Sequence, residues 1–193
     1  GGCHVEEQTQ YGASLHGHDP LAPSCKSCHG GHRVLRPSTA GSPTSTMEIP
    51  KLCGGCHREG TPVSQTRQIP QAHILGNYMD SIHGEGLFKR GLTVTAVCTS
   101  CHTAHFVLPH TDPRSSIAKA NIAKTCLRCH AQIERVHRKV IRGELWEKTP
   151  NLIPACVDCH EPHKVRRVFY AQGMSDRDCL RCHAAAGAAP AVN

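Results

Sequence analysis

Apolar residues are sparse along this chain, and few stretches repeat them with the period of a helix or a strand. The exception is the stretch from Asn121 to Lys148, which contains no proline and one glycine. Apolar residues recur there at helical spacing, so the stretch predicts one longer helix. These residues are Ile133, Val136, Val140, Ile141 and Leu145. The segment from Leu87 to Val97 predicts a short strand, and no apolar run is long enough to span a membrane.

Two further segments predict irregular structure. Residues 37–50 predict an extended surface loop, and residues 184–193, rich in alanine, glycine and proline, predict a loose C-terminus. Leucine, isoleucine, valine and phenylalanine make up 36 of the 193 residues, and aromatic residues only 4%. A chain with so few apolar side chains is expected to lack an aliphatic core of its own. We therefore expect another kind of group to fill the interior.

The 13 cysteines and 16 histidines indicate which group that is. Twelve of the cysteines form six C-x-x-C pairs, and a histidine directly follows every pair. C-x-x-C-H is the covalent attachment site of c-type haem, in which the thiols bind the haem vinyl groups and the histidine ligates the iron. A short helical turn is expected at each motif. The six motifs are Cys25/Cys28-His29, Cys53/Cys56-His57, Cys98/Cys101-His102, Cys126/Cys129-His130, Cys156/Cys159-His160 and Cys179/Cys182-His183.

Paired cysteines also build zinc sites and thiol–disulfide centres. Neither of these requires a histidine directly after the second cysteine, and six matches in six by chance are negligible in a chain with 16 histidines. The motifs therefore favour haem. The thirteenth cysteine, in Cys3-His4, fits the end of a seventh motif, which would make the sequence a fragment of a longer chain with no visible signal peptide. A stray Cys-His dipeptide is the alternative.

The motifs belong to a repeat. Three of them carry a further histidine three residues on, and each of these is followed by a plain C-x-x-C-H motif. The first two are preceded by Y-x-x-S-x-H-G, which begins at Tyr11 and at Tyr78. The repeat predicts four segments: residues 1–10 as the end of a preceding dihaem unit, 11–70 as unit 1, 71–132 as unit 2, and 133–193 as unit 3.

Each unit offers two spare histidines as distal iron ligands for its two haems. They are His16 and His32 in unit 1, His83 and His105 in unit 2, and His137 and His163 in unit 3. The histidine three residues after a motif lies on the same side as the proximal one, so it must reach a neighbouring haem. Of the remaining His18, His73 and His110, His73 is the candidate ligand for the His4 haem. Met47, Met79 and Met174 are alternative ligands, which would raise reduction potentials.

These residues resemble multihaem c-type cytochromes with doubled C-x-x-C-H motifs, over the chain from Cys3 to His183. The resemblance implies a mainly α and irregular fold with short helices, long loops, little β structure and a core of stacked haems. It also implies an exported protein, periplasmic or extracellular, that carries electrons through six haems c, or seven with the Cys3-His4 site. Its partners would be other redox proteins or respiratory-complex subunits, and some members of the group assemble into filaments.

An electron carrier, rather than an enzyme, is therefore the leading hypothesis. The alternative is a multihaem reductase or oxidase of a small nitrogen or sulfur compound, with one open haem site. The formal net charge of +7 suggests an acidic partner, but two propionates on each of six haems would turn it to about −5. Arginines such as Arg128, Arg166 and Arg181 are then expected to pair with propionates. No nucleic-acid partner is expected.

Overall fold

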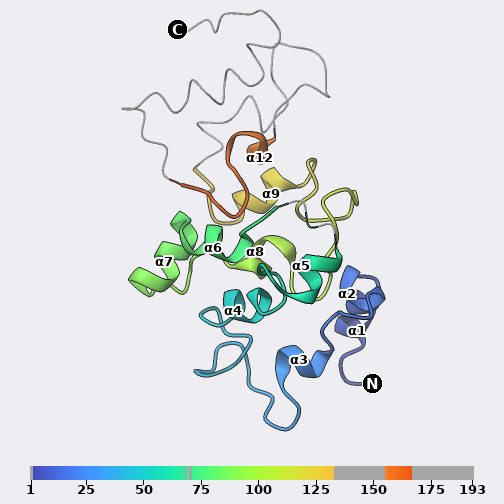
Figure 1. Cartoon of the computed structure of the whole chain (residues 1–193). Coiled ribbons are helices and arrows are strands. Elements are labelled where there is room, and N and C mark those ends of the chain that lie inside the picture. Colours follow the sequence, from blue (N-terminus) through green and yellow to red (C-terminus); the bar gives the residue numbers. More distant parts are fainter. Residues whose placement is uncertain (1, 68, 70, 133–154, 167–193) are drawn as a thin grey trace, which may run out of the picture.

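The computed structural model describes residues 2–67, 69, 71–132 and 155–166, and every structural statement below refers to these residues (Figure 1). They form short helices joined by turns and irregular segments, and no strand occurs among them. The helices are α1 Val5–Gly12, α2 Leu15–His18, α3 Cys25–His29, α4 Ile49–Gly54, α5 Pro62–Thr66, α6 Ile74–Met79, α7 Ile82–Arg90, α8 Cys98–His102, α9 Ile122–Leu127 and α12 Cys156–Cys159. No helix in this part of the chain is long and apolar enough to cross a membrane.

Polar caps and glycines explain why the helices are short. The Ser81 hydroxyl accepts a hydrogen bond from the Gly84 backbone N–H at 3.1 Å and begins α7. Gly91 ends the same helix in the left-handed conformation, with φ +66°. Thr61 caps α5 in the same way as Ser81, and Pro62 is its first residue.

Four of the helices that carry C-x-x-C-H motifs contact one another in chain order. Helix α4 packs against α8, α8 against α9, and α9 against α12. Figure 1 shows α4, α8, α9 and α12 following one another across the molecule, with α6 and α7 beside them. From the second motif to the fifth, the order along the sequence is thus also an order in space.

The apolar core of the described residues is small. One cluster consists of the buried side chains Ile49, Leu87 and Val97, and the partly buried Cys53 and Cys98 pack against it. Besides Pro50, four other apolar side chains of this part of the chain are buried, namely Tyr78, Leu108, Ala118 and Ile122. Two haem-motif cysteines therefore border the main apolar cluster.

The junctions between units repeat in structure. The Leu15 N–H donates to the Val107 carbonyl at 2.9 Å, and the Ile82 N–H donates to the Val165 carbonyl at 2.8 Å. Leu15 and Ile82 hold the same place in the Y-x-x-S-x-H-G motif, and each acceptor lies five residues after a motif histidine in the next unit. Each distal-histidine segment is therefore tied to the following unit in the same way.

Three expectations from the sequence were wrong. The strand expected over Leu87 to Val97 is absent, because residues 87–90 continue α7 from its serine cap. The helix expected over residues 121–148 ends at Leu127 and is followed by turns to residue 132, and residues 133–148 lie outside the described part. The loop expected over 37–50 is not all surface, because Ser42 is buried and α4 begins at the buried Ile49.

Candidate haem-binding sites

Four pairs of histidine rings face each other in the described structure. Each pair joins the histidine of a C-x-x-C-H motif to one of the spare histidines named above. Between ring centres, the distances are 6.2 Å for His57 and His16, 6.0 Å for His29 and His105, 6.0 Å for His130 and His83, and 5.8 Å for His102 and His163.

These separations suit two imidazoles on one metal ion. A nitrogen ligand lies about 2 Å from a first-row metal, which places the centres of two opposed imidazole rings about 6 Å apart. Among the described residues, no group of three or more His, Cys, Asp or Glu side chains is arranged to hold a metal ion. Haem iron takes four nitrogens from its macrocycle and needs two from the protein. The paired donors therefore fit the axial positions of haem.

The pairing follows one rule in both units where it can be read. The histidine of Y-x-x-S-x-H-G meets the second motif of its own unit, as His16 meets His57. The histidine three residues after a motif instead meets the first motif of the preceding unit, as His105 meets His29. The spare histidines thus alternate along the chain: one pairs with a motif histidine of its own unit, and the next pairs with a motif histidine of the preceding unit.

The Y-x-x-S-x-H-G motif forms a rigid turn that presents its histidine. In the second copy, the Ser81 hydroxyl donates to the Tyr78 carbonyl at 2.6 Å, and the Tyr78 hydroxyl donates to the Ala96 carbonyl at 3.0 Å. The first copy repeats both bonds, from Ser14 and Tyr11. The glycine after the histidine packs directly on this turn, because a Cβ at Gly84 would lie 2.0 Å from the Tyr78 carbonyl oxygen.

We expect Gly84→Ala to disrupt this turn. The added methyl meets backbone rather than a flexible side chain, so the turn must open, at a cost of about 3 kcal/mol. His83 would then leave His130, and the haem-loaded protein should gain one high-spin haem and unfold at lower denaturant concentration. The matched control is Gly86→Ala in the same helix, whose Cβ would lie 3.4 Å from the Thr95 hydroxyl in ordinary contact. Equal effects of the two variants would contradict this account of the motif.

Burial favours the ligating form of five of the paired histidines. The pKa values of His16, His57, His83 and His163 are all lowered, mainly by burial. For His102, burial and then repulsion from His163 lower the pKa to about 4. A neutral imidazole is the form that binds metals. The chain itself therefore holds these rings ready for ligation at neutral pH.

The motif cysteines meet at the junctions between units. Cys53, from the second motif of unit 1, lies in a hydrogen bond with Cys98 from the first motif of unit 2, which raises the pKa of the Cys53 thiol and lowers that of Cys98. Cys126 and Cys156 repeat this contact at the next junction, where burial first and then Cys156 raise the pKa of Cys126 to about 11. The attachment points of successive units therefore adjoin.

The second cysteines of the two plain motifs, Cys56 and Cys129, lie just beyond the ends of α4 and α9. The helical turn expected at these motifs is nevertheless present, because the His57 N–H donates to the Cys53 carbonyl at 2.9 Å and the His130 N–H donates to the Cys126 carbonyl at 3.1 Å. The backbone N–H of Cys56 donates to the Cys53 carbonyl at 3.1 Å, and that of Cys129 donates to the Cys126 carbonyl at 3.3 Å. Cys56 is only partly buried and Cys129 is exposed, so the chain encloses neither of these expected attachment sulfurs.

The same two cysteines nevertheless lie toward the other motif of their own unit. Burial first, and then the neighbouring thiols that include Cys56, raise the pKa of Cys28 in the first motif of unit 1. Burial also raises the pKa of Cys101 in the first motif of unit 2, and Cys129 adds to that rise. The thiols of the two motifs within a unit are therefore close enough to influence each other's ionisation.

Thr103 supports the fit to haem. It directly follows the motif histidine His102 and has a positive φ of 65°, and the equivalent residue of unit 1 is Gly30 with φ +79°. Its hydroxyl is buried and has no hydrogen-bond partner in the described structure. A buried polar atom without a partner is costly, and here it lies beside a candidate site for a cofactor that carries two carboxylates.

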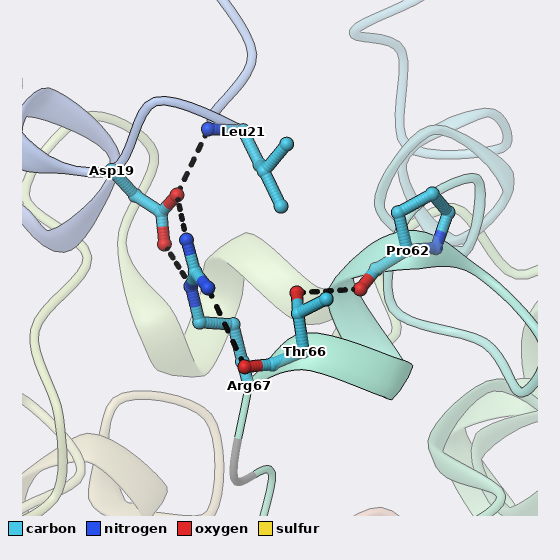
Figure 2. A network of polar contacts seen from close by, with 5 residues as sticks. All are labelled: Asp19, Leu21, Pro62, Thr66 and Arg67. Atoms are coloured by element: carbon cyan, nitrogen blue, oxygen red, sulfur yellow. Dashed lines mark hydrogen bonds and ion pairs between the residues drawn. The ribbon is translucent and has the colours of Figure 1, made fainter.

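An ion pair fastens the segment that carries His16. Figure 2 shows the Asp19 carboxylate, just after α2, held by the Arg67 guanidinium, just after α5. Arg67 donates from Nε at 2.5 Å and from Nη2 at 2.8 Å, and the Leu21 N–H donates to the same carboxylate at 2.9 Å. The hydrogen bonds from Arg67 and then Leu21 lower the pKa of Asp19 to about 2. The end of α5 thereby anchors the loop that follows His16.

This ion pair predicts a pH dependence. Because the pKa of Asp19 falls from about 3.9 in an unfolded chain to about 2 in the fold, its contribution is present above pH 4 and is lost as the pH falls to 2. Arg67→Gln should therefore lower the midpoint of thermal unfolding slightly at pH 6 and have no effect near pH 2. A difference that stays constant between these pH values would contradict the assignment.

Several expected site residues are not paired in the described structure. His4 faces Glu7 at 3.9 Å and His73 faces Glu59 at 3.2 Å, so the structure does not bring these two histidines together. His32 is exposed, and no ring contact is found for it in the described part of the chain. His18 and His110 are exposed as well, Met79 is 46% exposed, and Met47 packs on the apolar cluster.

Other expectations fall outside the described residues. These are Cys179, Cys182, His183, His137, Met174, Arg181 and the side chain of Cys159. His160 lies at the end of α12. Of the arginines expected to pair with propionates, Arg128 donates to the Ser100 carbonyl and Arg166 lies 3.9 Å from Asp80.

Sequence reasoning missed two sets of residues. Ser42 and Ser115 are buried at equivalent places and donate to the Leu35 and Leu108 carbonyls, and their equal spacing from the motifs was a usable signal. The side chain of Gln71 forms a hydrogen bond with His163, 92 residues later in the chain, and no sequence pattern predicts this contact. No protein-family model, curated protein or solved structure matches this chain.

Proposed function

We propose that this protein transfers electrons through a row of c-type haems, each held by two histidines. The observation that carries the proposal is the set of four histidine pairs, each of which joins a C-x-x-C-H histidine to a spare histidine at 5.8 to 6.2 Å. A bound haem would supply an iron that accepts and donates single electrons. The residues of the chain attach it, ligate it and bury it.

Both axial positions would be filled by protein in the four described pairs. Such a site has no position for a substrate, so the chain controls potential through its ligands, burial and hydrogen bonds. Apart from the exposed His130, the histidines of these pairs are partly buried, which also limits the access of water. These features favour an electron carrier over an enzyme that acts on a small molecule.

The arrangement of the pairs favours conduction between units. His105 and His163 each reach back to the first motif histidine of the preceding unit, which is His29 for His105 and His102 for His163. Motifs of successive units also approach each other through their cysteines, Cys53 with Cys98 and Cys126 with Cys156. The chain thus brings consecutive described motifs close together, as electron transfer along the chain requires.

The surroundings that this function needs belong to the same proposal. Covalent haem attachment places the protein outside the cytoplasm, in the periplasm or at the cell surface. Its partners are other redox proteins, a respiratory complex, or further copies in an assembly. The charge of the loaded protein, about −5 with six haems, does not favour nucleic acid as a partner.

Two measurements on the haem-loaded protein test the proposal. A spectroscopic redox titration should show several overlapping low-potential steps, and carbon monoxide added to the reduced protein should leave the visible spectrum of at least the four paired haems unchanged. A spectrum in which most haems bind carbon monoxide would refute paired-histidine ligation. Binding by a single haem, together with turnover of nitrite or hydroxylamine, would instead indicate the reductase alternative.

A further inference from the structure

Within the four described pairs, one spare histidine, His163, has a side-chain hydrogen bond at its ring. His163 Nδ1 lies 2.6 Å from Gln71 Oε1. Because an amide oxygen only accepts hydrogen bonds, Nδ1 must carry the proton, and Nε2 is left with the lone pair that a metal needs. Among the four described pairs, no other spare histidine has a side-chain hydrogen bond at its ring.

The surrounding geometry holds this contact in place. The His163 and His102 rings are nearly parallel, at 6° and 5.8 Å, closer to parallel than the other three pairs. His163 has a positive φ of 65°, a conformation that costs free energy and needs support from its surroundings. The backbone bond from Ile82 to Val165, two residues later, provides part of that support.

Gln71 comes from a different unit than the histidine it contacts. It lies just before α6, in the wall of a cavity of about 340 Å³ that His57 and Gln65 also line. His163 follows α12, in the third unit of the repeat. The Gln71 amide therefore contacts a histidine of the next unit. That histidine, His163, faces His102, which belongs to the same unit as Gln71.

We propose that Gln71 is a positioning residue for the haem ligated by His102 and His163. It fixes the tautomer and the orientation of the His163 ring, and as an acceptor it makes the ring a stronger electron donor to iron. Stronger donation favours the oxidised iron and lowers the reduction potential of that haem. This inference rests on the proposed function and adds to it a residue that tunes one haem of the row.

The test compares Gln71→Leu and Gln71→Glu in the haem-loaded protein by potentiometric titration and by electron paramagnetic resonance of the oxidised form. Gln71→Leu should raise the reduction potential of one haem. The expected change is about tenfold in the equilibrium constant for its reduction, which is about 59 mV for one electron. Gln71→Glu, with a charged acceptor, should lower that potential. The step that moves should be the one that moves in His163→Met, and Gln65→Leu in the same cavity wall should change neither readout.

The outcomes separate this inference from the function on which it rests. A wild-type protein without haem refutes the proposed function itself. Full haem loading with unchanged potential and resonance spectrum in both Gln71 variants leaves the function standing and overturns the role of Gln71. If Gln71→Leu does not fold, Gln71→Glu decides, since it keeps the size and the acceptor: a lowered potential supports the inference and an unchanged one overturns it.

Discussion

Replacing His105 by alanine should convert one haem of the loaded protein from low-spin to high-spin, although His105 belongs to unit 2 and the affected haem to unit 1. The structure places His105 against His29, with ring centres 6.0 Å apart and planes 30° apart. Removal of the imidazole would leave this iron with an open axial position. About one sixth of the low-spin signal should be lost, because the account assigns one haem to each of six complete motifs, and one haem should now bind carbon monoxide.

The control for this variant is His110→Ala. His110 lies on the same segment, is exposed, and belongs to none of the four pairs, so its removal should leave the spectrum and carbon monoxide binding unchanged. The affected haem can be assigned with Cys25→Ala/Cys28→Ala, which should abolish the new high-spin signal in the His105→Ala background. An unchanged spectrum in His105→Ala would contradict the pairing rule.

The second large effect is expected when haem is withheld. Besides Pro50, the described part of the chain buries only seven apolar side chains, and a valine, leucine or isoleucine among them contributes about 2 kcal/mol when fully buried. That is too little to offset the conformational entropy of ordering this part of the chain. The chain made without haem should therefore be unfolded at 25 °C, with no cooperative thermal transition by circular dichroism and rapid digestion by protease. The loaded protein should resist both.

A matched variant separates loss of haem from loss of cysteine. Cys98→Ala/Cys101→Ala should prevent haem attachment at the motif on α8, which contacts both α4 and α9, and should lower the stability of the loaded protein by several kcal/mol. Cys3→Ala, at an exposed site at the beginning of the chain, should lower it far less. A haem-free chain that unfolds cooperatively would show that the side chains alone suffice.

The sequence was most informative where a motif is specific for one chemistry, as C-x-x-C-H is for haem attachment. The C-x-x-C-H spacing predicts which histidines are proximal, and the position of His105 and His163 three residues after a motif predicts that they serve another haem. Which haem each one serves depends on how the units fold onto one another, and no local pattern encodes that. Only the structure sets His105 against His29 and His163 against His102.

The failures of sequence reasoning have physical causes. The segment from Leu87 looked like a strand because its apolar residues are close together, but the cap at Ser81 and the glycine at 91 set a helix that includes its first residues. Gly84 is needed because its Cα lies too close to the Tyr78 carbonyl oxygen for a side chain to fit, and a sequence motif does not reveal such a distance. The bond from Gln71 to His163 is tertiary and likewise invisible in sequence.

Haem counting on the intact protein tests the central claim most directly. The chain should be produced in a host that attaches haem to exported cytochromes, with a known c-type cytochrome as a loading control, and its mass measured under denaturing conditions. The account predicts a mass above the 20.9 kDa of the polypeptide by six haems, or seven if the Cys3-His4 site is part of a complete motif. A polypeptide mass without haem, in a host that loads the control, would contradict it.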